Sequence, residues 1–160
     1  MGISDCILLK PGRLEPHEFE IIKTHTTLGR DAIEHAEKLL GNNMDFLSCA
    51  KSIALSHQEK WDGSGYPQGL AGDDIPISAR LMAVADVYDA LISRRVYKEG
   101  MPHERAVQIM IENRGTHFDA DIIDAFVEIQ EEFHAIAQRF ADSDGDRDKK
   151  RAYPAQAYVA

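Results

Sequence analysis

Apolar residues recur at spacings of three and four through most of this 160-residue chain, and that pattern constrains its fold most strongly. Such spacing places apolar side chains along one face of an α-helix. No segment alternates convincingly between apolar and polar residues, as a half-buried β-strand does. The sequence therefore predicts an all-α fold, a helical bundle of about five helices.

Proline, glycine and asparagine mark the expected helix boundaries. The helices are expected at residues 15–40, 44–58, 77–93 and 102–115, and a fifth begins at 119 or 121 and extends through 133. Gly41-Asn42-Asn43 ends the first, and Pro102 begins the fourth, because a helix tolerates proline in its first turn. Residues 60–74 contain four glycines and one proline, too many breakers for a helix, and predict an ordered loop.

Charge and cysteine content exclude several classes of protein. With 18 Lys and Arg against 27 Asp and Glu, the net charge is −9 and the pI is near 5.2, so no DNA or RNA partner is expected. The longest apolar runs fall well short of the roughly 20 residues of a membrane crossing, and nothing resembles a signal peptide. Cys6 and Cys49 are too few for a disulfide framework. The chain is therefore expected in the cytoplasm, with free thiols and no membrane insertion.

A change in composition after Phe140 predicts a domain over residues 1–140 and a charged, disordered tail over 141–160. The spaced aspartates of the tail invite comparison with a calcium loop. An EF-hand loop starting at Asp142 needs glycine at its sixth position and glutamate at its twelfth, where this chain has Arg147 and Tyr153. A solvated tail of mixed charge is the better interpretation.

Two of the seven histidines occupy special places. His25 lies on the apolar side of the first expected helix, and His57 ends the second, directly before the glycine-rich loop. Taken singly, such a histidine is more often a core residue hydrogen-bonded to a neighbour. Asp86 and Asp89 interrupt an apolar run of the third helix, where a buried carboxylate is costly unless it is paired or binds a metal. In the alternative interpretation, both aspartates face solvent or pair with an arginine such as Arg80.

Imidazoles and carboxylates from different helices are how helical proteins build sites for iron, manganese or zinc. A bound metal acidifies water and polarises a phosphoryl oxygen. Five basic residues near these positions suit phosphate contact, although such residues at helix ends are usually only surface. They are Lys10, Arg13, Arg94, Arg95 and Lys98.

The loop carries the most specific motif in the chain. His57 to Pro67, HQEKWDGSGYP, resembles the signature loop of the HD-GYP family, bacterial metal-dependent phosphohydrolases that degrade cyclic di-GMP. Further segments look like motifs of that family in the family's order: residues 9–14, 23–29, 69–76, 84–91, 95–98 and 115–119. The resemblance covers about residues 3–130 and implies an all-α bundle of the HD-domain type.

Carried over position by position, the resemblance implies metal ligands at His25, His57 and Asp86. The implied cofactor is a divalent metal, iron or manganese, with a two-metal site in a complete relative. The implied reaction is attack of a metal-activated hydroxide on phosphorus in cyclic di-GMP, which opens the ring to pGpG and then yields GMP. The implied setting is bacterial second-messenger signal transduction.

The resemblance also implies residues that contact the substrate. Arg95 and Lys98 match residues that hold the ligand's phosphates. Gly65, Tyr66 and Pro67 match the loop implicated in substrate placement and in contact with GGDEF-type partner domains.

The chain departs from the family in two places. Gln58 stands where many members have a second metal-binding histidine, and glutamine is the poorer ligand. No histidine is followed by aspartate, so the His-Asp motif is missing, and we expect a domain that begins just after that motif and its helices. We expect this chain to hydrolyse cyclic di-GMP very weakly or not at all, and to expose apolar faces of its first and third helices or share them in a homodimer.

Two other functions fit the same residues. One is a non-catalytic module that binds a cyclic dinucleotide or a GGDEF partner, which near-zero metal content with retained partner binding would favour. The other is a phosphodiesterase for a different cyclic dinucleotide, such as cyclic GMP-AMP, because the sequence identifies no residue that reads a base.

Overall fold

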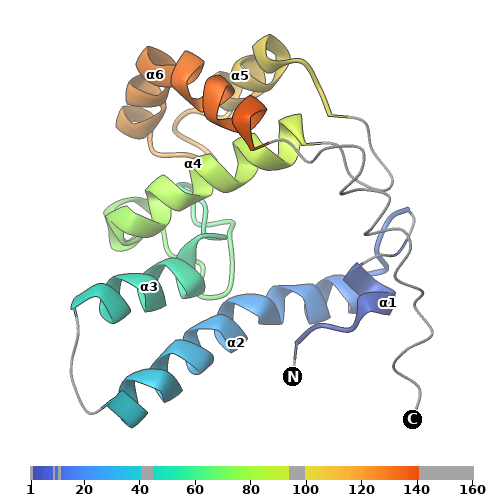
Figure 1. Cartoon of the computed structure of the whole chain (residues 1–160), viewed down its shortest axis with the longest axis vertical. Helices are drawn as coiled ribbons and strands as arrows, with labels where there is room; N and C mark the ends of the chain where they lie inside the picture. The colour runs from blue at the N-terminus through green and yellow to red at the C-terminus, as the bar shows by residue number, and fades with distance from the viewer. Residues whose placement is uncertain (1, 9, 11, 41–44, 94–99, 141–160) are drawn as a thin grey trace. The chain divides into compact units, whose positions relative to one another are not determined.

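The computed structural model describes residues 2–8, 10, 12–40, 45–93 and 100–140, which are mainly α-helical (Figure 1). The helices are α1 (Asp5–Leu8), α2 (Pro16–Leu40), α3 (Asp45–Ser56), the 3₁₀ turn η1 (Gly72–Asp74), α4 (Ile77–Ile92), α5 (His103–Glu112) and α6 (Ala120–Arg139). Among the described residues there is no strand, only an isolated bridge between Arg114 and Phe118. The all-α class and the five expected helices are confirmed, and the single-turn α1 is an addition.

Two helix ends differ from expectation. α3 stops at Ser56, so His57 follows the helix, although its N–H still donates to the carbonyl of Ile53 at 3.1 Å. α5 stops at Glu112, because the carbonyl of Asn113 accepts hydrogen bonds from the N–H groups of residues 116, 117 and 118 in a tight turn. Gly115 has a φ of +76° in that turn, a conformation that favours glycine.

The chain consists of two compact units, and the boundary between them falls between residues 128 and 129, within α6. In the first unit, α3 packs against both α2 and α4, and α5 packs against α4 (Figure 1). The buried apolar side chains of this unit are Ile75, Ala79, Ala83, Val84, Tyr88, Ala106, Val107, Met110, Phe118, Ile123 and Phe126. The core therefore lies around α4 and α5. In the second unit, the described residues continue α6 to Arg139.

Several sequence predictions concern the surface. Cys6 and Cys49 are exposed free thiols, as expected. Over the described residues, no helix combines the length and the apolar character that a bilayer crossing requires. The expected exposure of apolar residues is observed on α2 at Phe19, Ile21, Leu28 and Leu39, and on α4 at Ile77, Leu81 and Met82. The predicted tail at 141–160 lies outside the described residues.

Candidate metal centre

His25 and His57 face one another across the contact between α2 and α3. Their Nε2 atoms are 3.1 Å apart, and the ring centroids are 5.1 Å apart at an angle of 62°. His25 lies in the middle of α2, and His57 directly follows the last turn of α3. Both rings are half-buried. Helix packing thus brings together two of the histidines singled out in the sequence.

The backbone determines which nitrogen of each ring carries a proton. Nδ1 of His25 lies 2.7 Å from the carbonyl oxygen of Ile22, and Nδ1 of His57 lies 2.9 Å from that of Ile53. Because a carbonyl oxygen only accepts hydrogen bonds, both Nδ1 atoms donate, and in the neutral rings both Nε2 atoms carry lone pairs. Two lone pairs that face one another repel, so this arrangement favours a cation between them.

The spacing of the two nitrogens suits a metal ion. Nitrogens that each lie about 2.1 Å from one ion, at about a right angle, are about 3 Å apart. The backbone carbonyls that orient the rings are also typical outer partners of metal-binding histidines. The residues present therefore fit a divalent metal.

Asp86 lies on α4 and contacts Gln58, the residue after His57, but among the described residues its carboxylate does not form a close three-ligand group with the two imidazoles. The side-chain amide of Gln58 donates to Oδ2 of Asp86 at 3.2 Å. The expectation of a buried Asp86 is wrong, because the residue is exposed. Val84 and Tyr88 mark the buried face of α4, and a residue midway between them points to the other side of the helix.

Asp89 fits the alternative interpretation of the sequence. It is exposed, and its carboxylate accepts a hydrogen bond from the Ser93 hydroxyl at 2.9 Å. Arg80, considered as a partner for the aspartates of this helix, pairs instead with Asp119 at 2.8 Å and with Asp73 at 3.1 Å. Asp89 is therefore a surface residue one turn beyond Asp86.

Tyr66 connects the Gly-Tyr-Pro loop to the histidine pair. Its ring centroid lies 6.4 Å from that of His25, edge to face, and its N–H donates to the carbonyl of Gln58 at 3.1 Å. Burial raises the pKa of the Tyr66 phenol, and the negative charge of Asp86 raises it further. The phenol therefore stays protonated at neutral pH and can donate a hydrogen bond.

The buried carboxylate of Glu59 stabilises the glycine-rich loop through hydrogen bonds to its backbone. Its side chain is almost completely buried, and its two carboxylate oxygens accept hydrogen bonds from the N–H groups of Gln68 at 2.8 Å and Leu70 at 3.1 Å. At Gly65 any β-carbon would lie 2.3 Å from the backbone nitrogen of Lys60, so only glycine fits there. Sequence reasoning missed Glu59. The only signal was an acidic residue beside the glycines, which does not distinguish a buried carboxylate from a solvated one.

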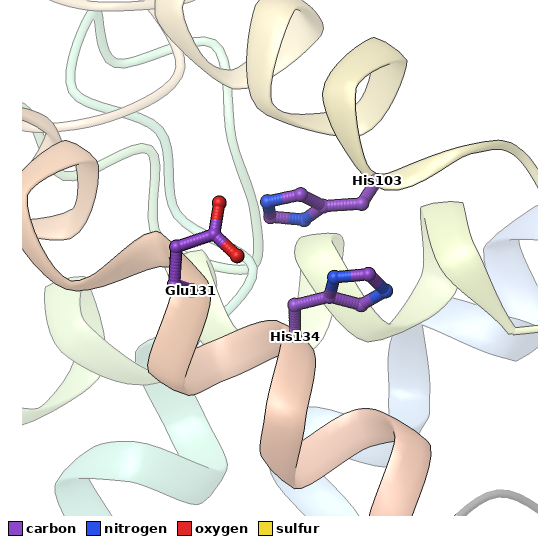
Figure 2. Close-up of side chains that lie close together, drawn as sticks. All are labelled: His103, Glu131 and His134. Carbon is purple, nitrogen blue, oxygen red and sulfur yellow. The ribbon is translucent and has the colours of Figure 1, made fainter.

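Arg95 and Lys98, the expected phosphate contacts, lie outside the described residues. Figure 2 shows three other residues of metal-ligating types, His103 at the start of α5 and Glu131 and His134 one turn apart on α6. His103 belongs to the first unit, where it is buried and its Nδ1 lies 2.8 Å from the Tyr88 hydroxyl. Glu131 and His134 belong to the second unit, so we do not combine the three into one site.

The chain is similar to known proteins over most of its length. The HD domain family matches residues 6–122. The chain is 59% identical over 144 residues to a probable cyclic di-GMP phosphodiesterase of Vibrio cholerae serotype O1, covering 90% of this chain and 33% of that protein. Against a cyclic di-GMP phosphodiesterase of the same organism, identity is 52% over 143 residues, covering 89% of this chain and 29% of that protein.

A third relative from Vibrio cholerae is named 3'3'-cGAMP-specific phosphodiesterase 2, and it is 39% identical over 142 residues, covering 89% of this chain and 26% of that protein. The chain thus spans about a third or less of the length of these relatives. The matched residues include the histidine pair, the Gly-Tyr-Pro loop and Asp86. With the loop motif and the helical fold, these matches establish that the chain belongs to the HD-GYP family of HD domains.

Proposed function

We propose that this domain is a metal-dependent phosphodiesterase that hydrolyses cyclic di-GMP. The observation that carries the proposal is the pair of imidazole Nε2 atoms of His25 and His57, 3.1 Å apart beside the Gly-Tyr-Pro loop. The HD domain is a divalent-metal-binding domain, which agrees with that geometry. The names of the relatives supply the substrate class.

The proposed ligands are His25, His57 and Asp86, and the proposed metal is iron or manganese. Imidazole and carboxylate donors together suit these ions. A bound divalent cation supplies Lewis-acid chemistry, because it lowers the pKa of water and polarises a phosphoryl oxygen. Gln58 holds the Asp86 carboxylate by its amide, and the backbone carbonyls of Ile22 and Ile53 orient the two rings.

In the proposed reaction, the oxygen of one water molecule forms a bond to phosphorus. The bond from that phosphorus to the ribose 3' oxygen breaks, and a proton ends on that oxygen, which leaves linear pGpG. Tyr66 donates a hydrogen bond to the substrate, and the Gly-Tyr-Pro loop positions it. Arg95 and Lys98 neutralise the phosphate oxygens. A second hydrolysis yields two molecules of GMP.

Cyclic GMP-AMP is the second candidate substrate. The relative named 3'3'-cGAMP-specific phosphodiesterase 2 favours it, at 39% identity over 142 residues. Its phosphodiester bonds are chemically the same, so only contacts with the bases can discriminate between the two dinucleotides.

The setting we propose is cytoplasmic signal transduction in a bacterium, with a GGDEF-type domain as partner of the Gly-Tyr-Pro loop. Exposure of Pro67 and Gln68 in that loop supports a contact with another protein. Exposed apolar residues on α2 and α4, such as Leu28 and Leu81, support a homodimer. Light scattering of the full chain tests the dimer: a monomeric mass at all concentrations contradicts it.

Hydrolysis is tested with the full chain loaded with manganese, in molar excess over cyclic di-GMP so that slow turnover is detected. We expect pGpG, identified by mass spectrometry, and its loss on addition of a chelator. Asp86→Ala and His57→Ala should abolish it. The matched controls, Asp89→Ala on the same helix and His35→Ala on α2, should retain it because neither residue is a proposed ligand; the Asp89 carboxylate bonds instead to Ser93.

Two results would contradict the proposal. Chain that holds metal and binds cyclic di-GMP without forming pGpG is a binding module. Hydrolysis that survives Asp86→Ala and His57→Ala comes from somewhere other than this centre.

A further inference from the structure

An aromatic and cationic cluster lies beside the histidine pair. Phe19 and Lys23, one turn apart on α2, meet Tyr66 of the loop. The rings of Phe19 and Tyr66 are 6.1 Å apart, edge to face at 83°. The Nζ atom of Lys23 lies 5.1 Å from the Phe19 ring centroid and 5.7 Å from that of Tyr66. We call these three residues the Phe19 cluster.

The Phe19 cluster is open to solvent and adjoins the candidate metal centre. Phe19 is 43% exposed, so part of its ring is accessible to a ligand. The side chain of Lys23 is 30% exposed and forms a 2.7 Å ion pair with Glu20. Tyr66, the third member, also contacts the ring of His25. A ligand whose phosphate lies at His25 can therefore reach the cluster with another part of the same molecule.

The chemistry of the cluster matches a nucleobase. Exposed aromatic rings are stacking platforms for bases. A lysine ammonium has only donors, so it matches the acceptors O6 and N7 that guanine presents on one edge. Adenine offers one acceptor there, N7, and replaces O6 by an amino donor. The cluster thus has both a surface for stacking and a charge that favours guanine.

We propose that the Phe19 cluster is a subsite for a guanine base of the cyclic dinucleotide. This inference rests on the proposed function for the identity of the ligand. It adds residues that read a base, which the sequence did not reveal. Stacking on Phe19 supplies affinity for any purine, and Lys23 supplies the preference for guanine.

A base-specific experiment separates this role from simple packing of the loop. The full chain, free of metal, is titrated with GMP, AMP and ribose 5-phosphate, which lacks a base, and the dissociation constants are measured by NMR. Phe19→Leu should weaken GMP binding by about tenfold and leave ribose 5-phosphate unchanged. Lys23→Gln should remove the preference for GMP over AMP. Phe46→Leu is the matched control, because Phe46 is 77% exposed on α3, and it should change nothing.

A second variant at Phe19 keeps a large side chain, so it tests the subsite without removing volume from the packing between α2 and the loop. Phe19→Trp keeps an aromatic surface and adds a fluorophore, so GMP should quench its emission and ribose 5-phosphate should not. The proposal is wrong if Phe19→Leu weakens both ligands equally, or if GMP does not quench the Phe19→Trp variant more than the wild type. Base-dependent binding without any hydrolysis would contradict the proposed activity but support the guanine subsite. Hydrolysis without base-dependent binding would support the proposed activity but contradict the guanine subsite.

Discussion

The α2–α3 pair and the α4–α5 pair of the first unit differ in how many buried apolar residues they contain. α4 and α5 carry seven of the eleven buried apolar residues among those described, including Ala79, Tyr88 and Met110. α2 and α3 contain Thr26 and Ser56 as their buried residues, among those described, and both are polar. Yet the histidine pair belongs to α2 and the end of α3. The histidine pair thus lies where α2 and α3 pack against one another, and these two helices contain few buried residues among those described.

Because of this difference, we expect that metal binding and folding can be altered separately. Removing apolar volume from α4 or α5 should cost stability, whereas changes on the exposed side of α2 should not. Conversely, polar substitutions around His25 and His57 should change metal affinity with little effect on the free energy of unfolding.

The largest expected effect is on stability. Met110→Ala should lower the free energy of unfolding by about 3 kcal/mol, because Met110 is completely buried and the substitution leaves a cavity. Leu39→Ala on α2 should change it by no more than about 0.5 kcal/mol, because Leu39 is 75% exposed. Urea denaturation of both variants measures the difference. Equal losses would show that the two pairs of helices contribute alike.

The next effect is on metal affinity. Gln58→Leu should weaken manganese binding about tenfold, because it removes the amide that holds the Asp86 carboxylate. The measurement is competition with a chelator, and the free energy of unfolding of the metal-free chain should stay the same. Gln68→Leu is the control: the Gln68 side chain is exposed, and only its backbone N–H bonds to Glu59. An unchanged affinity in Gln58→Leu would show that Gln58 does not position Asp86.

Helical spacing was sufficient to predict the helices and to place His25 on the apolar side of its helix, whereas the resemblance to the family implied that His25 and His57 share a site. The i, i+3, i+4 pattern tells which side of a helix a residue occupies, and two helices that pack do so through those sides. Their role as ligands stays a prediction. The loop motif from His57 to Pro67 identified the family, because its combination of residues is not explained by the requirements of a helix or a strand.

The i, i+3, i+4 spacing could not predict which helix faces are buried against other parts of the chain. Asp86 lies in an apolar run but is exposed, because residues on both sides of it, Val84 and Tyr88, point the other way. Glu59 is buried because the N–H groups of Gln68 and Leu70 turn back toward it, and spacing does not encode such a loop path. Contacts between residues distant in the chain, such as Phe19 with Tyr66, likewise appear only in three dimensions.

A smaller effect concerns how closely α2 and α3 approach. Gly29 lies within α2, and a β-carbon there would be 3.4 Å from that of Ala54 on α3, an ordinary contact. Gly29→Ala should therefore raise the free energy of unfolding by about 0.5 to 1 kcal/mol, the usual gain from replacing glycine within a helix. Thermal unfolding measures the gain. A loss instead of a gain would show that the helices have no room at this contact.

The smallest expected effect is a dependence of stability on pH that arises outside the α2–α3 pair. Burial lowers the pKa of His117, and the positive charge of Lys60 lowers it further, while Asp62 opposes the shift. The His117 ring therefore binds a proton more readily in the unfolded chain than in the folded one. Above the unfolded pKa, about 6.5, the ring is neutral in both states and does not change the free energy of unfolding. Stability falls as the pH drops from there toward the lower folded value.

The informative quantity is the difference between variants in how their stability depends on pH. The change in the free energy of unfolding between pH 7.5 and pH 5.5 should be smaller in His117→Asn than in the wild type. His35→Asn replaces an exposed histidine of α2 and should leave that change as it is in the wild type. The opposite result would be a smaller change in the free energy of unfolding in His35→Asn and an unaltered change in His117→Asn. It would show that the pH dependence of stability arises in the α2–α3 pair and would contradict this prediction.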